Sequence, residues 1–117
     1  MIPTQEHVLR ELYKIRAALQ LFRVRRIGVF GSVARNSARV DSDIDIIVDF
    51  ACEDETIANF FGLQDFLSDH FQRKVDVIPE SGLKPFSRDL VMRDAVFLED
   101  LDEPTTEVEA ESTLSQA

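Results

Sequence analysis

The sequence predicts one α/β domain followed by an acidic tail. Segments with apolar residues at helical spacing alternate with short runs rich in β-branched residues, which is typical of helices packed on a sheet. The chain has 117 residues, the length of a single domain, and 44% of them are hydrophobic. We therefore expect one core, formed by residues 1–98, and a tail at residues 99–117.

The first half of the predicted domain is a long helix, a buried strand and a very short helix. The long helix spans residues 4–21, where apolar side chains recur at helical spacing and Thr4 suits the N-cap position. The wholly apolar run 27–30 predicts a strand buried on both faces. Residues 32–35 are interpreted as a short helix with the Ser32 hydroxyl at its N-cap, where unpaired backbone N–H groups can bind an anion.

The next strand, predicted over residues 43–50, begins with two carboxylates on one face. Side chains alternate along a strand, so Asp43 and Asp45 point the same way. The apolar residues at every second position from Ile44 onward form the opposite face, which we expect to be buried.

A second long helix is predicted over residues 57–71, with Thr56 at its N-cap. Apolar residues recur in it at helical spacing and form a stripe that includes Ile57 and Phe61. We interpret this stripe as packing against the sheet.

The last part of the domain is predicted to be a strand, a helix and a short extended segment. The strand covers residues 74–78 and has Asp76 at its centre, where a carboxylate is costly unless something pairs with it. Pro85 suits the first position of a helix that continues to about residue 94. Residues 95–98 are expected to be a short extended or docking segment.

Charge is distributed unevenly along the chain. The formal net charge is −9, but residues 99–117 contain seven acids and no base, so 15 acids and 13 bases remain in residues 1–98. A nearly neutral domain lacks the basic footprint that binding to a long nucleic acid usually needs. The tail is acidic and poor in large apolar residues, so we expect it to be disordered.

The sequence also lacks membrane and export signals. No segment is apolar over the roughly 20 residues that a membrane span needs, and the N-terminus has neither the basic nor the apolar region of a signal peptide. Cys52 is the one cysteine, so no intramolecular disulfide can form, which fits a reducing compartment. We therefore expect a cytoplasmic protein without a membrane partner.

Three carboxylates fall on two segments that we expect to be neighbouring strands. Asp43 and Asp45 lie about 7 Å apart along one strand, and such side chains can converge on two Mg²⁺ ions about 3.5–4 Å apart in a phosphoryl-transfer site. Asp76 on the adjacent strand could ligate the second ion and accept the proton of an attacking hydroxyl. Gly31 would let the backbone approach a phosphate chain, and the Ser32 hydroxyl would bind its outer oxygens.

Two other motifs for metals or phosphates are excluded. An EF-hand loop beginning at Asp41 fails because Ile46 stands where the loop needs glycine and Cys52 where it needs glutamate. A P-loop fails because no Lys-Ser or Lys-Thr pair follows Gly31. A Gly-Ser turn or an Asp-x-Asp pair alone is common, so the prediction depends on their joint occurrence in this order.

The segments 31–35 (GSVAR) and 42–46 (SDIDI) together resemble the Gly-Ser-x(10)-Asp-x-Asp signature of the DNA polymerase beta superfamily of nucleotidyltransferases. The short chain and the Gly-Ser-x-Ala-Arg form resemble its minimal nucleotidyltransferase (MNT) branch. The resemblance covers residues 5–98 and implies an α+β fold with a small mixed β-sheet flanked by helices. It also implies Mg²⁺ and an NTP, usually ATP, at the site.

By position in this resemblance, Ser32 is the motif serine, Asp43 and Asp45 are the metal-binding pair, and Asp76 is the third acid. Many proteins of this branch pair with a HEPN-domain RNase toxin. The resemblance therefore implies an antitoxin that transfers AMP from ATP to a tyrosine hydroxyl of its toxin, within a hetero-oligomer.

Three residues around the motif are open to interpretation. Arg35 or Arg39 could contact phosphate. The alternative for each is an ordinary solvated loop arginine. Asn36 stands where the family often has glycine, and since asparagine tolerates left-handed backbone angles, we expect the turn to be kept.

Two other functions are compatible with the same residues. A small-molecule hydroxyl, as in aminoglycoside-modifying relatives, would be another acceptor, but no second substrate-binding domain is present. A non-catalytic antitoxin that neutralises its partner by contact is disfavoured because all three acids are present. The tail would be either a solvated end or a segment that reaches a basic surface on an RNA-handling partner.

Overall fold

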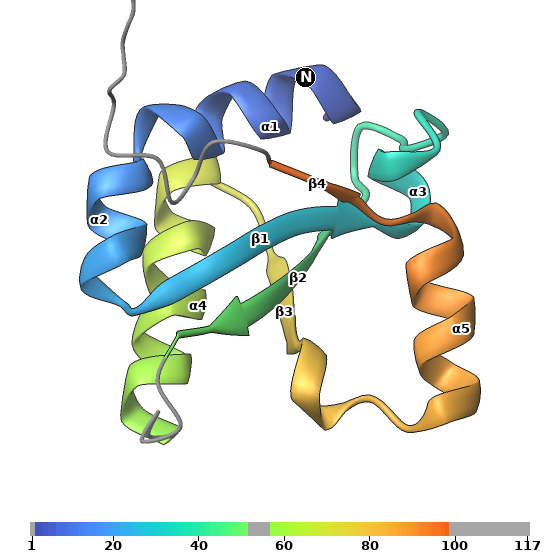
Figure 1. Cartoon of the computed structure of the whole chain (residues 1–117). Coiled ribbons are helices and arrows are strands. Elements are labelled where there is room, and N and C mark those ends of the chain that lie inside the picture. Colours follow the sequence, from blue (N-terminus) through green and yellow to red (C-terminus); the bar gives the residue numbers. More distant parts are fainter. Residues whose placement is uncertain (1, 52–56, 99–117) are drawn as a thin grey trace, which may run out of the picture.

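The computed structural model describes residues 2–51 and 57–98, which form a four-stranded sheet lined by helices (Figure 1). The helices are α1 (Gln5–Lys14), α2 (Arg16–Leu21), α3 (Gly31–Ala34), α4 (Ile57–Phe71), the 3₁₀ helix η1 (Glu80–Gly82) and α5 (Pro85–Asp94). The strands are β1 (Val24–Phe30), β2 (Ile44–Phe50), β3 (Val75–Pro79) and β4 (Val96–Phe97). The predicted tail and the predicted cap at Thr56 lie outside the described residues.

The strand order across the sheet is β3-β2-β1-β4. Strand β1 is antiparallel to β2 and to β4, whereas β2 and β3 are parallel. Two parallel strands need a crossover connection, and α4 lies in that crossover. The small mixed sheet flanked by helices confirms the predicted fold class, and the pairing of β2 with β3 confirms that the two acidic strands are neighbours.

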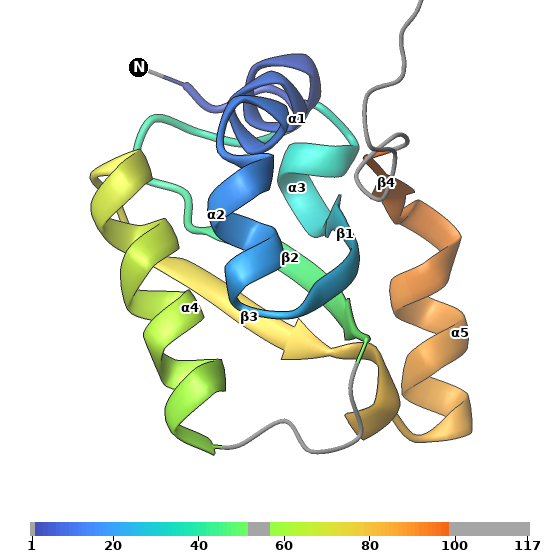
Figure 2. The same ribbon diagram turned by 60° about the vertical axis from the view of Figure 1, so that its left-hand side comes forward.

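One face of the sheet carries the hydrophobic core, and α1, α2 and α4 cover it, while α5 lies apart from them beyond the other side of the sheet (Figure 2). On β2 the predicted alternation holds, because Ile44, Ile46 and Val48 are buried in this core. Burying one such side chain contributes about 1.5–3 kcal/mol. The core therefore fixes which face of β2 remains for Asp45.

The single helix predicted over residues 4–21 is wrong in one respect, because the chain leaves helical geometry at Ile15 (φ −103°, ψ 20°). The break changes the direction of the chain between α1 and α2, and both Leu12 and Leu19 are then fully buried. The predicted cap is confirmed, since the Thr4 side chain accepts a hydrogen bond from the backbone N–H of His7.

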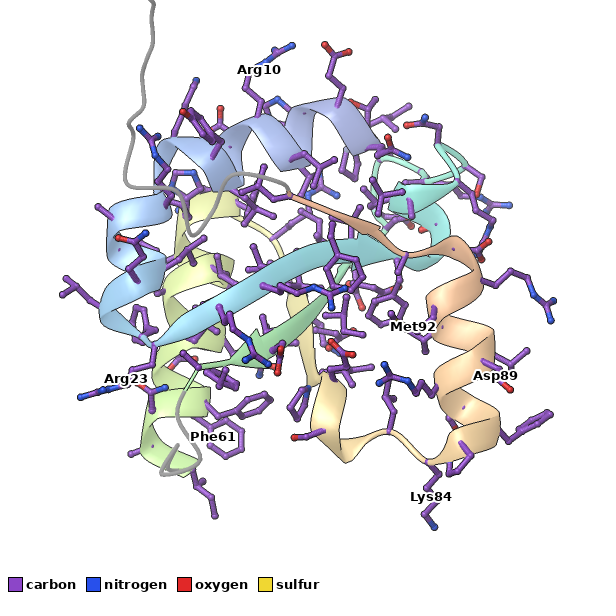
Figure 3. The ribbon with its side chains drawn as sticks, viewed as in Figure 1. Arg10, Arg23, Phe61, Lys84, Asp89 and Met92 are labelled. Atoms are coloured by element: carbon purple, nitrogen blue, oxygen red, sulfur yellow. The ribbon has the colours of Figure 1, made fainter. Side chains whose placement is uncertain are left out.

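The apolar stripe predicted on α4 is also partly wrong. Ile57 is 77% exposed and Phe61 is 52% exposed, whereas Leu63 and Leu67 are fully buried. The first turns of α4 extend past the sheet, as the position of the labelled Phe61 shows (Figure 3). Apolar side chains there have the spacing of a buried stripe but no core to pack against. The predicted range of this helix, 57–71, is confirmed.

The strand predicted over residues 27–30 begins earlier, at Val24, whose side chain is buried in the core. The pairing with β2 shifts register between Val24 and Arg26, and the two arginines that precede Ile27 are exposed.

At the other end of the domain, Pro85 occupies the first turn of α5, and β4 confirms the extended segment predicted for residues 95–98. None of the helices in the described ranges has the length and apolarity to cross a membrane.

Candidate active site

The turn that follows β1 requires glycine for two reasons. Gly31 has a φ of +71°, a conformation that L side chains rarely adopt. A Cβ atom placed on Gly31 would also lie 2.5 Å from Oδ2 of Asp45. The turn and the Asp45 carboxylate are therefore in direct contact, which sequence reasoning did not reveal.

The short helix after this turn differs from its prediction at one position. Helix α3 begins at Gly31, its N-cap is Phe30, and no side chain caps it. The predicted N-cap role of Ser32 is therefore wrong, because Phe30 is still extended (φ −141°, ψ −179°) and the helix starts directly after it. Asn36 adopts the expected left-handed conformation (φ 58°), and its Oδ1 accepts a hydrogen bond from the backbone N–H of Gln5.

The three predicted acids meet at the edge of the sheet where β2 and β3 begin. Asp45 pairs in register with Asp76 across the two parallel strands, and Asp43 immediately precedes β2. The side chains of Asp43 and Asp76 are 44% and 43% exposed, and Asp45 is half-buried. We call Asp43, Asp45 and Asp76 the acid corner.

The charges of the acid corner act on one another. Burial raises the pKa of Asp45 above its ordinary value, the negative charges of Asp76 and then Asp43 raise it further, and the Arg35 guanidinium opposes this shift. Lys74 lies between the two outer acids, with its Nζ 3.8 Å from Oδ2 of Asp43 and 3.8 Å from Oδ1 of Asp76.

The acid corner suits a hard divalent cation but does not enclose one. No group of three His, Cys, Asp or Glu side chains within residues 2–51 and 57–98 is arranged to hold a metal ion. The donors nevertheless are all carboxylate oxygens, the type that Mg²⁺ prefers, and their mutual repulsion is relieved by a cation. The ammonium group of Lys74 already lies where positive charge is favoured. The assignment of these acids as metal ligands remains a prediction.

Arg35 joins two elements of the site. Its Nη1 donates a hydrogen bond of 2.8 Å to Oδ2 of Asp94, which links α3 to the end of α5. Near the beginning of α5, Arg88 donates a hydrogen bond of 2.7 Å to Glu80 in η1. The two ion pairs anchor α5 beside the sheet, where the labelled Met92 points towards the sheet and Asp89 points away from it (Figure 3). Contact between Arg35 and phosphate remains a prediction.

Sequence reasoning missed the residue that holds the loop before β2. Nη1 of Arg73 donates hydrogen bonds to the backbone carbonyls of Val40 (3.1 Å) and Ser42 (2.8 Å). The backbone N–H of Ile44 also donates to the carbonyl of Lys74. These bonds tie the segment that carries Asp43 to the start of β3. Such contacts with carbonyls leave no pattern in a sequence. The place of Lys74 beside the acids could have been predicted, because Lys74 and Asp76 are two residues apart and so lie on the same face of the strand.

Comparisons with known proteins identify a matching family. A family model described as "Nucleotidyltransferase domain" matches residues 9–98. The chain is similar to "Protein adenylyltransferase MntA" of Thermococcus cleftensis, with 40% identity over 77 residues that cover 66% of this chain and 77% of the relative.

Solved structures share the fold. One is described as "Structure of putative minimal nucleotidyltransferase" and superposes with a TM-score of 0.63 and 39% identity over 75% of this chain and 93% of the other. Another is described as "Crystal structure of the toxin-antitoxin with AMP-PNP" and superposes with a TM-score of 0.64 over 77% of this chain and 71% of the other. Their identity is 21%, so this second likeness concerns the fold alone.

Proposed function

The chain belongs to the family of nucleotidyltransferase domains, and from this we propose that it is an antitoxin that transfers AMP from ATP to a hydroxyl of a partner protein. The observation that carries the proposal is the parallel pairing of β2 with β3. This pairing sets Asp45 opposite Asp76, beside the turn at Gly31. Acids from two strands and a glycine turn from a third thus converge on one place.

The proposed roles follow from position. Asp43, Asp45 and Asp76 would hold two Mg²⁺ ions beside the triphosphate. When bound, Mg²⁺ neutralises phosphate charge and orients the reacting groups. Gly31 and Ser32 bind the outer phosphates through the backbone N–H groups and hydroxyl of the turn. Arg35, whose charge already acts on Asp45, adds a positive group for phosphate.

Asp76 accepts the proton of the acceptor hydroxyl. The hydroxyl oxygen then forms a bond to the α-phosphorus of ATP, and the bond from that phosphorus to the oxygen that bridges it to the β-phosphate breaks. Pyrophosphate leaves, and AMP remains on the acceptor. The Asp76 side chain is 43% exposed, so a hydroxyl on another protein can reach it.

The acceptor is a tyrosine hydroxyl of a cognate HEPN-domain RNase toxin, and the two proteins form a hetero-oligomer. A protein acceptor is supported by the relative that is named a protein adenylyltransferase. A structure of the same fold was solved as a toxin-antitoxin with the ATP analogue AMP-PNP, which motivates the choice of a toxin as partner. We place the reaction in the cytoplasm, where ATP is present, with neither a membrane nor a long nucleic acid as direct partner.

Incubating the chain with the cognate toxin and ATP labelled in its α-phosphate tests the proposal. The wild type should label the toxin, and a double variant, Asp43→Ala with Asp45→Ala, should not. Asp89→Asn is the matched control, because it removes one negative charge from a side chain that points away from the sheet (Figure 3). Undiminished labelling by the double variant would overturn the proposed site.

Two additions to this experiment separate the other functions: an aminoglycoside in the reaction, and an assay of the toxin's RNase activity afterwards. Label that enters an aminoglycoside and not the toxin would identify a small-molecule acceptor. Full neutralisation of the toxin by the double variant would identify an antitoxin that acts by contact alone.

A further inference from the structure

Lys74 lies between the two outer acids of the acid corner. Its Nζ is 3.8 Å from a carboxylate oxygen of Asp43 and 3.8 Å from one of Asp76. We propose that Lys74 is an internal counter-ion, which neutralises the acid corner in the metal-free protein and is displaced when a divalent cation binds. This inference rests on the proposed function, because it requires the acids to be the metal ligands.

The backbone of Lys74 is fixed while its side chain is free to move. The carbonyl of Lys74 accepts a hydrogen bond from Ile44, and the preceding residue, Arg73, bonds to two carbonyls of the loop before β2. The Lys74 side chain is nevertheless 70% exposed. An ammonium group on a flexible stem can therefore leave the acid corner without any change in the strands.

The contacts of Lys74 are those of a shared counter-ion. Both distances are 3.8 Å, well beyond the 2.8 Å of the hydrogen bond from Arg35 to Asp94. Exposed ion pairs of this kind contribute little individually, so a metal that coordinates the same oxygens directly can replace the ammonium.

Competition follows because the lysine and the metal need the same oxygens. A divalent cation bound by Asp43 and Asp76 occupies the space and the negative potential that now favour the ammonium. Lys74 should therefore weaken the binding of divalent cations in the absence of nucleotide, and its removal should strengthen that binding.

Titration calorimetry of the full chain with Mn²⁺, without nucleotide, tests the inference. Lys74→Gln should bind Mn²⁺ about three- to tenfold more tightly than the wild type, and Lys74→Arg should stay close to the wild type. Lys14→Gln is the matched control, because Lys14 also pairs with a carboxylate, that of Glu11, but on α1. High salt should reduce the difference, since screening weakens the competition.

Three outcomes would overturn the inference, and they separate it from the proposed function. Equal or weaker binding by Lys74→Gln overturns the counter-ion alone, and so does an equal gain in Lys14→Gln, which would indicate an effect of total charge. Failure of every variant to bind Mn²⁺, with or without AMP-PNP, overturns the metal site and the counter-ion together.

A second readout does not depend on a calorimetric signal. In EDTA, Lys74→Gln should melt below the wild type because repulsion within the acid corner is no longer offset. Mg²⁺ should then raise its melting temperature more than that of the wild type. An equal rise in both proteins would contradict the inference.

Discussion

Replacing Asp45 by Asn should stabilise the metal-free protein and abolish the divalent-cation binding proposed for the acid corner. Asp45 lies opposite Asp76 on the neighbouring strand and two residues after Asp43. With separations of about 5 Å and 7 Å, and with screening by 0.1 M salt in a high dielectric, the two repulsions cost about 0.8 kcal/mol. Asparagine has the same shape, so it removes this cost and keeps the contact with the turn at Gly31.

The expected gain is a rise of about 2–5 °C in melting temperature, after allowance for the lost attraction to Arg35. The gain depends on pH with a definite sign. Burial and the neighbouring acids raise the pKa of Asp45 in the folded protein, so its ionised form destabilises the fold above that pKa. The cost disappears as the pH falls through the raised pKa, because the wild-type carboxyl becomes neutral. The difference between variant and wild type should therefore be largest near neutral pH and shrink in acid.

Thermal melts followed by circular dichroism in EDTA, at several pH values, measure this difference. Asp49→Asn is the matched control, because Asp49 lies on the same face of β2 but is paired with Arg25. Loss of the Asp49 carboxylate should leave the melting temperature unchanged or slightly lower. A lower melting temperature for Asp45→Asn near neutral pH, or an equal gain for Asp49→Asn, would refute the reasoning.

Three further predictions concern the scaffold of the site. Gly31→Ala should lower the free energy of unfolding, measured in urea, by about 1–3 kcal/mol, because Gly31 has a positive φ and contacts Asp45. The control Gly82→Ala should cost far less, because its added Cβ would lie 3.5 Å from the nearest neighbour. Equal costs for the two variants would contradict this prediction. Arg73→Gln should increase hydrogen exchange in the loop before β2, and unchanged exchange would show that its carbonyl contacts do not hold the loop. Hydrogen bonds from Lys14 and His70 lower the pKa of Glu11 despite its burial, so its ionised form stabilises the fold and this stability is lost as the pH falls through that pKa. Glu11→Gln should therefore lose less stability in acid than the wild type. An unchanged acid transition would exclude this role.

Local patterns in the sequence were enough to predict the elements that carry the site. The alternation of side chains along a strand correctly predicted that Asp45 and Ile44 lie on opposite faces of β2. The position of Pro85 correctly predicted the start of α5. These predictions succeeded because each depends on residues adjacent in the chain.

Contacts between distant segments could not be predicted in the same way. The register that sets Asp45 opposite Asp76 depends on how α4 returns the chain to the sheet, and the need for glycine at position 31 depends on a carboxylate 14 residues later. The apolar stripe on α4 failed at Phe61 for a related reason, because periodicity indicates a face but not where the sheet beneath it ends.

Asp45 has a buried apolar neighbour, Ile47, on its own face of β2. Ile47 follows Asp45 on the same face of β2 and is fully buried, although this face lies opposite the main core. Apolar cover therefore extends along the strand towards Asp45, which agrees with desolvation as the largest cause of its raised pKa. A poorly hydrated carboxylate loses less water when it binds a cation, so the burial that makes ionised Asp45 costly to the fold should also make it the strongest ligand of the three.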